Sequence, residues 1–499
     1  MPSIALPVSL RGQLLSGSRF NPISLFSAGE QGIWLEPSDL TTMFQDRAGT
    51  TPVTTPGQTV GLRLDKSKGL TLGSVSTAAS WTNSAAAWDV FSATGGSFTA
   101  EKTTAGGTDI AYSDVFPFVL GNWYQVTINV VSTTLSSYSV SLNATTNSRS
   151  TSATFSGTGV KTGLVQANVS SGNFSLAVST TSLGSISVTS VSVREIAGNH
   201  AVAPTDAARP TYGIEPKTGQ RNLLLATDTM ATQSLTVTAV AHTLAFTGTG
   251  TVTLTGASIA GPLVGTGASN RVSLTFTPTA ASLTLTVVGS VTLAQLELGS
   301  TATAYQRVGN AFDVTEAGVP TCHYVQYDGT DDSLSTSSIN FTATDKMSVF
   351  AGVRKLSDAA AGTIAEMSAA FFANNGSFAL FAAGSTAPTG FEFDSRGTAN
   401  VLAGAASAAP VTNVLAGIGD ISGDRATLRI NGTLSFQNPT DQGTGNYGNY
   451  PLFIGRRNNT NLPFNGRDYG IIIVGKAASA TEITNTESYL AANTSGVSI

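Results

Sequence analysis

The sequence is poor in charge and in cysteine. Only 11% of its 499 residues are Asp, Glu, Lys or Arg, less than half the usual share of about 25%. The 25 basic and 30 acidic side chains give a formal net charge of −5, and the basic residues form no run. The electrostatic footprint of a nucleic-acid-binding surface is therefore absent. Cys322 is the single cysteine, which excludes an intramolecular disulfide and a CxxC zinc or redox site.

Long apolar runs are missing as well. The sequence has no stretch of about 18 apolar residues, and no basic segment precedes an apolar core at its N-terminus. We therefore expect a soluble protein, without membrane insertion and without the usual export signal. A hydrophobic content of 41%, with 23 Phe, offers enough apolar surface to offset the entropy of ordering the chain, so disorder is excluded too.

What the sequence does contain is alternation of apolar and polar residues. Tyr124, Val126 and Ile128 share one face of the segment YQVTINV, and similar runs closed by Gly, Asn or Ser recur along the chain. Such period-2 runs are typical of half-buried β-strands. Near residue 190 the apolar set steps from Val188 to Val191, which predicts a β-bulge. We expect an all-β protein built from several antiparallel β-sandwiches.

Shifts in composition divide the chain into five parts. Residues 75–196 predict a small sandwich that resembles carbohydrate-binding modules in outline, and residues 197–218, rich in Pro and Gly, indicate a connector. Residues 219–308 predict a second small sandwich. Arg271 is its only charged residue between Thr229 and Leu296, and its Thr-rich strands have little protection against edge pairing. We expect another domain or subunit to cover those edges, which favours a homo-oligomer.

The two ends of the chain differ in character. Residues 309–499 predict one large sandwich, whereas residues 1–74 contain six Pro and no sustained period, which indicates an extended N-terminal arm. The segment SDLTTMF predicts a short helix capped by Ser38. Near the C-terminus, SATEITNTESYLAANT predicts a helix with Ser479 or Thr481 as N-cap. Its apolar face would pack on a sheet end through Ile483, Tyr489 and Leu490.

Three motifs carry a resemblance. Residues 29–67 (GEQGIWLEPSDLTTMFQDRAGTTPVTTPGQTVGLRLDKS) resemble the N-terminal module of many tailed-bacteriophage structural proteins. Residues 325–336 (VQYDGTDDSLST), with ATLRINGTL and the segment from PLFIGRR to ATEI, resemble a concanavalin A-like (laminin-G-type) jelly roll in the same kind of protein. Residues 294–308 (AQLELGSTATAYQRV) look like the closing strand of small phage sandwich domains. The first two resemblances cover about half of the chain.

The resemblance also implies how the parts connect. In such phage proteins the LDKS segment runs on through a GNHA to ARPT stretch into DGTDD. In this chain the two small sandwiches separate those three pieces. We therefore expect both sandwiches to be insertions, and residues 32–69, 197–216 and 309–330 to converge in space.

Concanavalin A-like folds include both lectins and glycanases, so paired carboxylates need attention. Glu392 and Asp394 lie two apart on a predicted strand and thus face the same side. The glycanase pattern of this fold resembles E-x-D with a second Glu four or five residues after the first, but those positions hold Arg396 and Gly397. Half of the acid and nucleophile pair is missing. We expect no enzyme, and we interpret the pair as a structural ion pair or a solvated strand face.

No cofactor or histidine-based metal site is indicated. Cys322 and His323 are neighbours on a strand and point to opposite faces, so they cannot form a thiolate–imidazole pair. His200 and His242 have no partners at ligand spacing. The acidic turn comprises Asp328, Asp331 and Asp332, which offer oxygen ligands to calcium; the alternative is an Asp-Gly turn between strands.

A glycan site needs an exposed aromatic ring to stack a sugar, and polar groups to bond its hydroxyls. In the first sandwich the candidates, for which core packing is the alternative, are Trp88, Trp123 and Tyr124. In the C-terminal domain the candidates lie around one loop and strand, with a solvated hairpin as the alternative; they are Tyr447, Tyr450, Arg456, Arg457 and Asn458.

The resemblance implies a non-enzymatic bacteriophage virion structural protein, assembled in the host cytoplasm. We expect a tail fibre or tail appendage whose N-terminal arm docks on other virion proteins, while the sandwiches bind host cell-surface polysaccharide. Many copies would raise the avidity by about 10² to 10⁴ over a single weak contact. One alternative is a capsid-surface decoration or head fibre protein, and a second is a glycan-degrading depolymerase.

Overall fold

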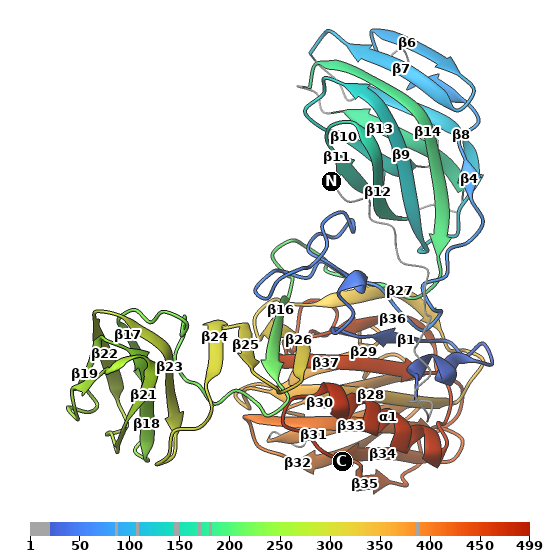
Figure 1. The fold of residues 1–499 in the computed structure, drawn as a ribbon. Coiled ribbons are helices and arrows are strands. Elements are labelled where there is room, and N and C mark those ends of the chain that lie inside the picture. Colours follow the sequence, from blue (N-terminus) through green and yellow to red (C-terminus); the bar gives the residue numbers. More distant parts are fainter. Residues whose placement is uncertain are drawn as a thin grey trace.

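The computed structural model describes residues 20–84, 88–105, 109–143, 149–167, 171–178, 182–384 and 389–499. Three β-sandwiches make up the molecule: one large sandwich, a second above it and a small one at its side (Figure 1). The chain is 52% strand and 5% helix, which confirms the predicted all-β class with several antiparallel sandwiches. No helix in these ranges is long and apolar enough to span a membrane.

The large sandwich packs a ten-stranded sheet against a nine-stranded sheet. Neighbouring strands are antiparallel except for β16 and β25. The ten-stranded sheet contains, in order, β24 (Gln306–Asn310), β25 (Asp313–Glu316), β16 (Thr211–Pro216), β26 (Thr321–Asp328), β37 (Asn465–Val474), β28 (Lys346–Lys355), β33 (Val411–Asp420), β34 (Arg425–Ile430) and β35 (Thr433–Asn438), with β1 (Gly32–Leu35) also paired to β37. The nine-stranded sheet contains β2 (Met43–Phe44), β3 (Leu62–Arg63), β15 (Ala201–Val202), β27 (Leu334–Asn340), β36 (Asn449–Ile454), β29 (Gly362–Met367), β30 (Ser377–Ala382), β31 (Gly390–Arg396) and β32 (Asn400–Ala406).

Three distant pieces of the chain build this sandwich, as predicted. Strand β1 pairs with β37, so Trp34 lies opposite Ile472. Strand β3 pairs with β15, which in turn pairs with β27. The part of the expected N-terminal arm that the structure describes, from Phe20 onward, thus contributes strands to both sheets. The predicted convergence is confirmed, and both smaller sandwiches are insertions into the large one.

A buried ion pair joins the two sheets of the large sandwich. Arg63 on β3 bonds to Asp468 on β37, and both side chains are 1% exposed. The other carboxylate oxygen of Asp468 accepts the backbone N–H of Gly470 at 2.7 Å. Burial alone would lower the pKa of Arg63, but Asp468 raises it above its usual value. Each charge is therefore stable in the interior only because the other is present.

Two of the described helical elements, α1 and η1, lie on the outer face of the ten-stranded sheet. The main helix, α1 (Ala480–Asn493), begins after Ser479, one of the two predicted caps, which forms a capping box with Glu482. Leu490 is buried, and α1 lies across the sheet face rather than at a sheet end (Figure 1). A 3₁₀ helix, η1 (Pro22–Phe26), packs in the same hydrophobic cluster.

The predicted short helix near residue 40 exists as a 3₁₀ turn with a different cap. The element η2 spans Leu40–Thr42, and its N-cap is Asp39, whose carboxylate accepts the N–H of Thr41. The cap expected at Ser38 is wrong, because that hydroxyl donates to Glu36 at 2.8 Å instead.

The second sandwich, residues 73–196, stands on one end of the large sandwich (Figure 1). The predicted bulge is confirmed, because the register between β14 and β9 shifts on both sides of Val188. One sheet contains β12 (Gly159–Gln166), β9 (Trp123–Thr133), β14 (Gly184–Ile196), β7 (Ser97–Lys102) and β6 (Val90–Thr94), with β4 (Ser76–Thr77) beside β14. The other contains β11 (Arg149–Phe155), β10 (Tyr138–Asn143), β13 (Ser171–Val178), β8 (Asp109–Pro117) and β5 (Trp81–Asn83).

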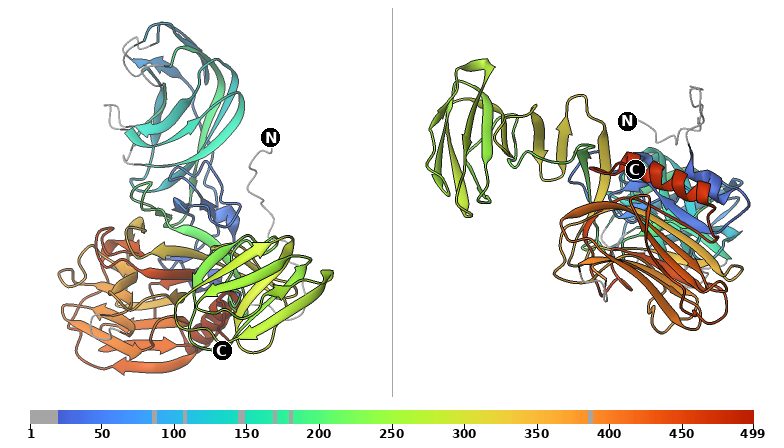
Figure 2. Two further views of the ribbon diagram at one scale, coloured as in Figure 1. Left: turned by 90° about the vertical axis from the view of Figure 1, so that its left-hand side faces the viewer. Right: turned by 90° about the horizontal axis from the view of Figure 1, so that it is seen from below.

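The small Thr-rich sandwich stands off from the side of the large one, as the view from below shows (Figure 2). Alternating side chains such as Leu254 and Leu285 form its core, while Thr253 and Thr255 are exposed. Within the described chain its strands pair only with each other. One sheet contains β21 (Gly267–Phe276), β18 (His242–Gly248) and β23 (Val291–Leu298); the other contains β17 (Gln233–Thr236), β22 (Ser282–Val288), β19 (Thr251–Gly256) and β20 (Leu263–Val264).

The Arg63–Asp468 pair gives a stability prediction. Arg63→Met removes one charge and leaves Asp468 buried without its partner, so the free energy of unfolding of the large sandwich should fall by about 3–5 kcal/mol. Hydrogen exchange of β3 and β37 peptides, measured across a urea series, reads out this sandwich separately from the insertions. The matched control is Arg425→Met, which removes a 44% exposed arginine from Asp420 and should cost about 0–1 kcal/mol. Equal losses in the two variants would contradict the prediction.

Candidate functional site

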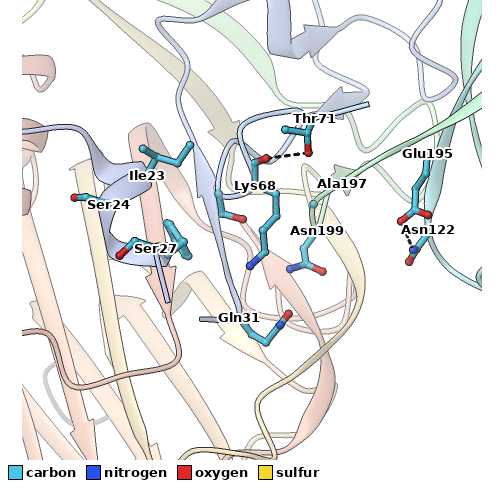
Figure 3. Close-up of a pocket in the computed structure, with 13 residues that line it drawn as sticks. Ile23, Ser24, Ser27, Gln31, Lys68, Thr71, Asn122, Glu195, Ala197 and Asn199 are labelled. Atoms are coloured by element: carbon cyan, nitrogen blue, oxygen red, sulfur yellow. Dashed lines mark hydrogen bonds between the residues drawn. The ribbon is translucent and has the colours of Figure 1, made fainter. Parts of the chain in front are cut away.

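An open cleft of about 720 Å³ lies at the junction of the large sandwich and the second sandwich (Figure 3). Its walls come from η1, the residue before β1, the segment after β3, the residue before β9, and the end of β14 with the residues that follow it. The amide and charged side chains that line it are Gln31, Lys68, Asn122, Glu195 and Asn199, and the hydroxyl side chains are those of Ser24, Ser27, Ser67 and Thr71.

Hydrogen bonds hold several of these side chains in place. Asn122 donates to Glu195 at 2.7 Å, and the Lys68 ammonium donates to the carbonyl of Glu30 at 2.8 Å. The Asn199 amide donates to the carbonyl of Gly32 at 2.7 Å. Each bond uses only part of the side chain, so a carboxylate oxygen, an amide oxygen and ammonium hydrogens have no partner within the described residues and can bond to a ligand. The Gln31 side chain is exposed at the rim. This set of donors and acceptors suits a polyhydroxylated ligand.

Beneath the cleft, the LDKS and GNHA motifs meet in one buried polar cluster. The carboxylate of Asp65 accepts the backbone N–H groups of Trp34 at 2.8 Å and Asn199 at 2.7 Å, and its own N–H donates to Nδ1 of His200 at 2.9 Å. Burial lowers the pKa of His200 to about 4, so the ring is neutral. The cluster fixes the points where the chain leaves and re-enters the large sandwich.

A hydrophobic junction holds the second sandwich against the large one. Trp123 packs there with Leu62 and Leu164, and the N–H of Leu164 donates to the carbonyl of Ala48 at 2.9 Å. Trp123 is 1% exposed, so the expectation that it offers a stacking surface is corrected. The apolar–polar alternation along β9 does not indicate that another domain would cover the outward-facing ring of Trp123.

The other two aromatic candidates of the second sandwich are also buried. Trp88 is 2% exposed, and Asn83 bonds to its backbone N–H and carbonyl. Tyr124 is 5% exposed; its hydroxyl accepts the N–H of Val119 at 2.8 Å, and its ring contacts Phe118 edge to face. Core packing, the alternative interpretation, accounts for both rings.

The predicted rim in the C-terminal domain does not assemble. Tyr447 is 1% exposed, and its hydroxyl bonds to Ser395, so the ring belongs to the core. The Tyr450 hydroxyl donates to the carbonyl of Asn375 at 3.1 Å. Arg456 donates to the carbonyl of Thr460, and Asn458 is an exposed turn residue with a φ of 49°. Arg457 turns instead onto the outer face of the nine-stranded sheet.

Three carboxyl groups also lie on that outer face. Glu366 pairs across the strands with Ala379, and Ala379 with Asp394, so both acidic side chains point away from the core between the sheets. Glu366, Glu392 and Asp394 are fully buried, so the solvated-face interpretation of Glu392 and Asp394 is wrong. Burial, and then the charge of Glu392, raise the pKa of Asp394 to about 9. Arg457 donates to both oxygens of Glu366, at 2.9 and 2.7 Å.

The acidic turn has the local hydrogen bonds of an Asp-Gly turn, and its carboxylates also lie close enough together to hold an ion. The oxygen atoms of Asp328, Asp331 and Asp332 that would hold an ion lie within 4.8 Å of one another. Asp328 accepts the N–H of Thr330 at 2.7 Å, and Asp332 accepts the N–H of Asp328 at 3.0 Å. Burial, and then the charge of Asp328, raise the pKa of Asp332 to about 7.

The cysteine and the histidines have structural surroundings. Burial raises the pKa of the Cys322 thiol to about 11. His323 bonds through Nδ1 to the hydroxyl of Tyr212 at 2.7 Å, and His242 bonds through Nδ1 to the carbonyl of Val240 at 2.8 Å. Among the described residues, the one group of three or more side chains placed to hold a metal ion contains neither Cys322 nor a histidine.

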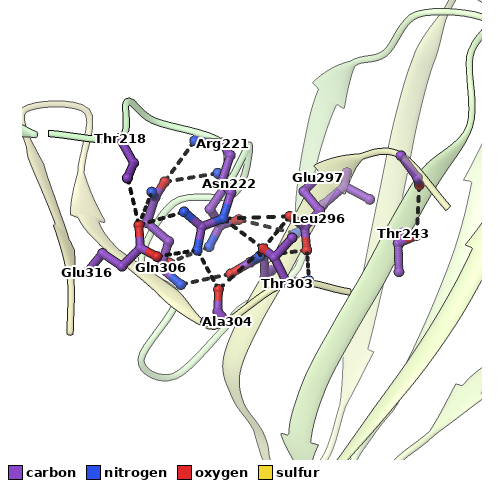
Figure 4. A network of polar contacts seen from close by, with 12 residues as sticks. Thr218, Arg221, Asn222, Thr243, Leu296, Glu297, Thr303, Ala304, Gln306 and Glu316 are labelled. Atoms are coloured by element: carbon purple, nitrogen blue, oxygen red, sulfur yellow. Dashed lines mark hydrogen bonds and ion pairs between the residues drawn. The ribbon is translucent and has the colours of Figure 1, made fainter. Parts of the chain in front are cut away.

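A polar network fixes the small sandwich to the large one (Figure 4). Arg221 donates to both oxygens of Glu316, at 2.5 and 2.7 Å, and to Thr303 at 2.7 Å. These hydrogen bonds hold the pKa of Glu316 below its usual range. Gln306 accepts the backbone N–H groups of Arg221 and Asn222. The motif at residues 294–308 thus closes the small sandwich and also forms its joint.

Comparisons with known proteins find likeness only among solved structures. No protein family and no curated protein matches the chain. The botulinum neurotoxin type G receptor-binding domain is 12% identical over 34% of this chain and 42% of its own, with a TM-score of 0.27. The CBM40 of Ruminococcus gnavus IT-sialidase, bound to α2,3-sialyllactose, is 18% identical over 29% of this chain and 83% of its own, with a TM-score of 0.24. The match thus spans less than half of the toxin domain, and such low scores support no inference about this chain.

The raised pKa of Asp332 gives a pH prediction. Because the folded state favours the protonated carboxyl, the stabilisation that Asp332 gives is present below the ordinary pKa of Asp. It is lost as the pH rises through the folded-state pKa of about 7. In the absence of calcium, the melting temperature of the large sandwich should fall by a few degrees between about pH 5 and pH 8. Asp332→Asn should flatten that decline, whereas the exposed Asp206→Asn should not. Restoration of the wild-type melting temperature by excess calcium would show that the acidic turn binds the ion.

The joint at Arg221 predicts a change of shape. Arg221→Ala removes the bidentate bond to Glu316, so the small sandwich should sample more orientations, while the fold of each sandwich is kept. Small-angle X-ray scattering should then show a larger radius of gyration and a broader distance distribution. Arg271→Ala removes an exposed guanidinium from the same small sandwich and should change neither quantity. An unchanged scattering curve for Arg221→Ala would contradict the prediction.

Proposed function

We propose that the chain is a non-enzymatic structural protein of a bacteriophage virion, a tail fibre or tail appendage that attaches to host cell-surface polysaccharide. The observation that carries the binding role is the cleft at the root of the second sandwich, with its partly unused amide, carboxylate and ammonium groups. The virion role is supported by the motifs at residues 29–67 and 325–336, whose segments converge around that cleft and in the large sandwich.

The surroundings of the carboxyl groups favour binding over hydrolysis. A glycosidase needs two carboxyl groups that flank a sugar bond in an accessible site. Glu392 and Asp394 are fully buried side by side on one strand. The positions where the resemblance requires a second acid hold Arg396 and Gly397. The cleft itself contains one carboxylate, Glu195.

Multivalency belongs to the proposal, because an open polar cleft without an aromatic platform binds a single sugar chain weakly. Several copies on one particle raise the effective concentration and thus the avidity. The edge strands β17 and β20 of the small sandwich carry no charge and have no further strand partner within the described chain, so a second copy or another virion protein would add there. Imaging the virion with this chain located tests its place on the tail against the capsid alternative.

Gln31 provides the test of the cleft. Gln31→Ala removes an exposed amide from the rim and leaves the backbone bond from Gly475 to the Gln31 carbonyl intact. Loss of one neutral hydrogen bond of about 0.5–1.5 kcal/mol should weaken binding roughly 2- to 12-fold. Native affinity electrophoresis in gels containing surface polysaccharides from a bacterial panel measures this loss. Gln437→Ala, an equally exposed amide on β35, is the control. Equal migration of the two variants would remove the cleft from the proposal.

A further inference from the structure

Phe372 is an exposed aromatic ring on the outer face of the nine-stranded sheet. Its exposed fraction is 56%, against 45% for Phe436 on β35. It lies in the loop between β29 and β30, in the segment AAFFANNGS, where no strand period predicts its direction. A phenyl ring held in water exposes apolar surface that a ligand would cover with a gain in free energy.

The ring is held in place by its neighbours. Phe371 is fully buried and contacts Phe372 edge to face, with ring centres 5.1 Å apart. The backbone N–H of Phe371 donates to Glu366 at 3.2 Å, which pins the loop to β29. A ring fixed in this way loses little conformational entropy when a ligand stacks on it.

A hydrogen-bond donor lies beside the exposed ring. The guanidinium of Arg457 lies 5.5 Å from the ring centre of Phe372 and 5.4 Å from that of Phe381. Its Nε bonds to both oxygens of Glu366, so the side chain is fixed. Its Nη2 is buried and has no hydrogen-bond partner in the described part of the chain. An unmade hydrogen bond of this kind costs free energy. Because Nη2 itself is buried, a ligand hydroxyl would meet the guanidinium on the part of the Arg457 side chain that is exposed, 17% in all.

Other unsatisfied polar atoms lie on the same face. The Thr363 side chain is fully buried, and its hydroxyl has no partner among the described residues. Thr363 pairs with Phe381 and Phe381 with Glu392, so the side chains of all three point to the outer face. Apart from the adjacent carboxyl of Glu392, neither oxygen of Asp394 has a partner in those ranges. Donors and acceptors are thus both left unsatisfied here.

The charge on this face selects the kind of ligand. Arg457 pairs with Glu366, and a pKa of about 9 keeps Asp394 protonated and uncharged near neutral pH. Glu392 then remains as a carboxylate. Arg396, two residues after Asp394 on β31, adds a guanidinium to the same face and bonds to Asn375. The charges therefore nearly cancel, so an anionic sugar gains no net attraction here. A neutral sugar has an apolar ring face for the phenyl group, and hydroxyls that both donate and accept hydrogen bonds.

We propose that Phe372 and Arg457 form a second carbohydrate contact, in which a neutral sugar residue stacks on the phenyl ring and its hydroxyl accepts a hydrogen bond from the guanidinium. This inference rests on the proposed attachment function and gives it a substrate class. It also supplies the aromatic platform that the cleft lacks.

Native affinity electrophoresis of the full chain tests the proposal. The gels contain either neutral polysaccharides (dextran, galactomannan, arabinogalactan) or acidic ones (polygalacturonate, polysialic acid). At least one neutral polysaccharide should retard the wild type more than either acidic one. Phe372→Ala should weaken that retardation about tenfold, as loss of a central aromatic contact does. Phe372→Tyr should keep it, and Phe436→Ala, which removes the other exposed phenyl ring, should leave it unchanged.

The outcomes separate the two proposals. Equal retardation of Phe372→Ala and Phe436→Ala, retardation only by the acidic polysaccharides, or none by the neutral ones would overturn the second contact. If Gln31→Ala weakens binding while Phe372→Ala does not, the attachment function stands and the second contact fails. If only Phe372→Ala weakens binding, the cleft fails and the second contact stands.

Discussion

The fold depends on a charge pair that closes the large sandwich. Arg63 and Asp468 are 405 positions apart in sequence and meet where water does not reach. A single buried charge is costly, so the native arrangement requires β3 and β37 to be in place together. Each inserted sandwich has its own core and needs no part of this pair. The contacts that complete the large sandwich therefore join residues that lie before and after both insertions in the sequence. Such long-range contacts give the chain a high contact order.

Polar clusters mark both places where the insertions meet the parent sandwich. Asp65 and His200 lie at the root of the second sandwich, and Arg221 and Glu316 at the root of the small one. Hydrogen bonds are directional, so they fix an angle between domains where apolar contacts alone would allow sliding. The two insertions differ in the other contacts that hold them against the large sandwich. The second sandwich also rests on the apolar junction around Trp123, whereas the small one extends to the side with exposed Thr faces.

Regular elements were predictable from the sequence, and most of the candidate site was not. Alternation identified the strands, the slip beside Val188 identified a real bulge, and Ser479, one of the two expected N-caps, caps α1. The same alternation could not tell that the outward ring of Trp123 would face another domain. The cleft side chains come from four separate segments without periodicity. Phe372 lies in a loop, where no strand period predicts the direction of its side chain. Only the LDKS and GNHA motifs pointed to that region, through the resemblance.

The pairing of β3 with β15 has a consequence for how such a chain can change. Arg63 and Ala201 are direct partners across these strands, and Leu72 and Ile196 are bridge partners next to the second sandwich, so the two backbone segments that flank it lie about 5 Å apart. A short turn could bridge them, and any module whose own termini lie close together could be grafted there without altering either parent sheet. Another domain with a different surface could thus replace the second sandwich, while the strands of the large sandwich keep their register.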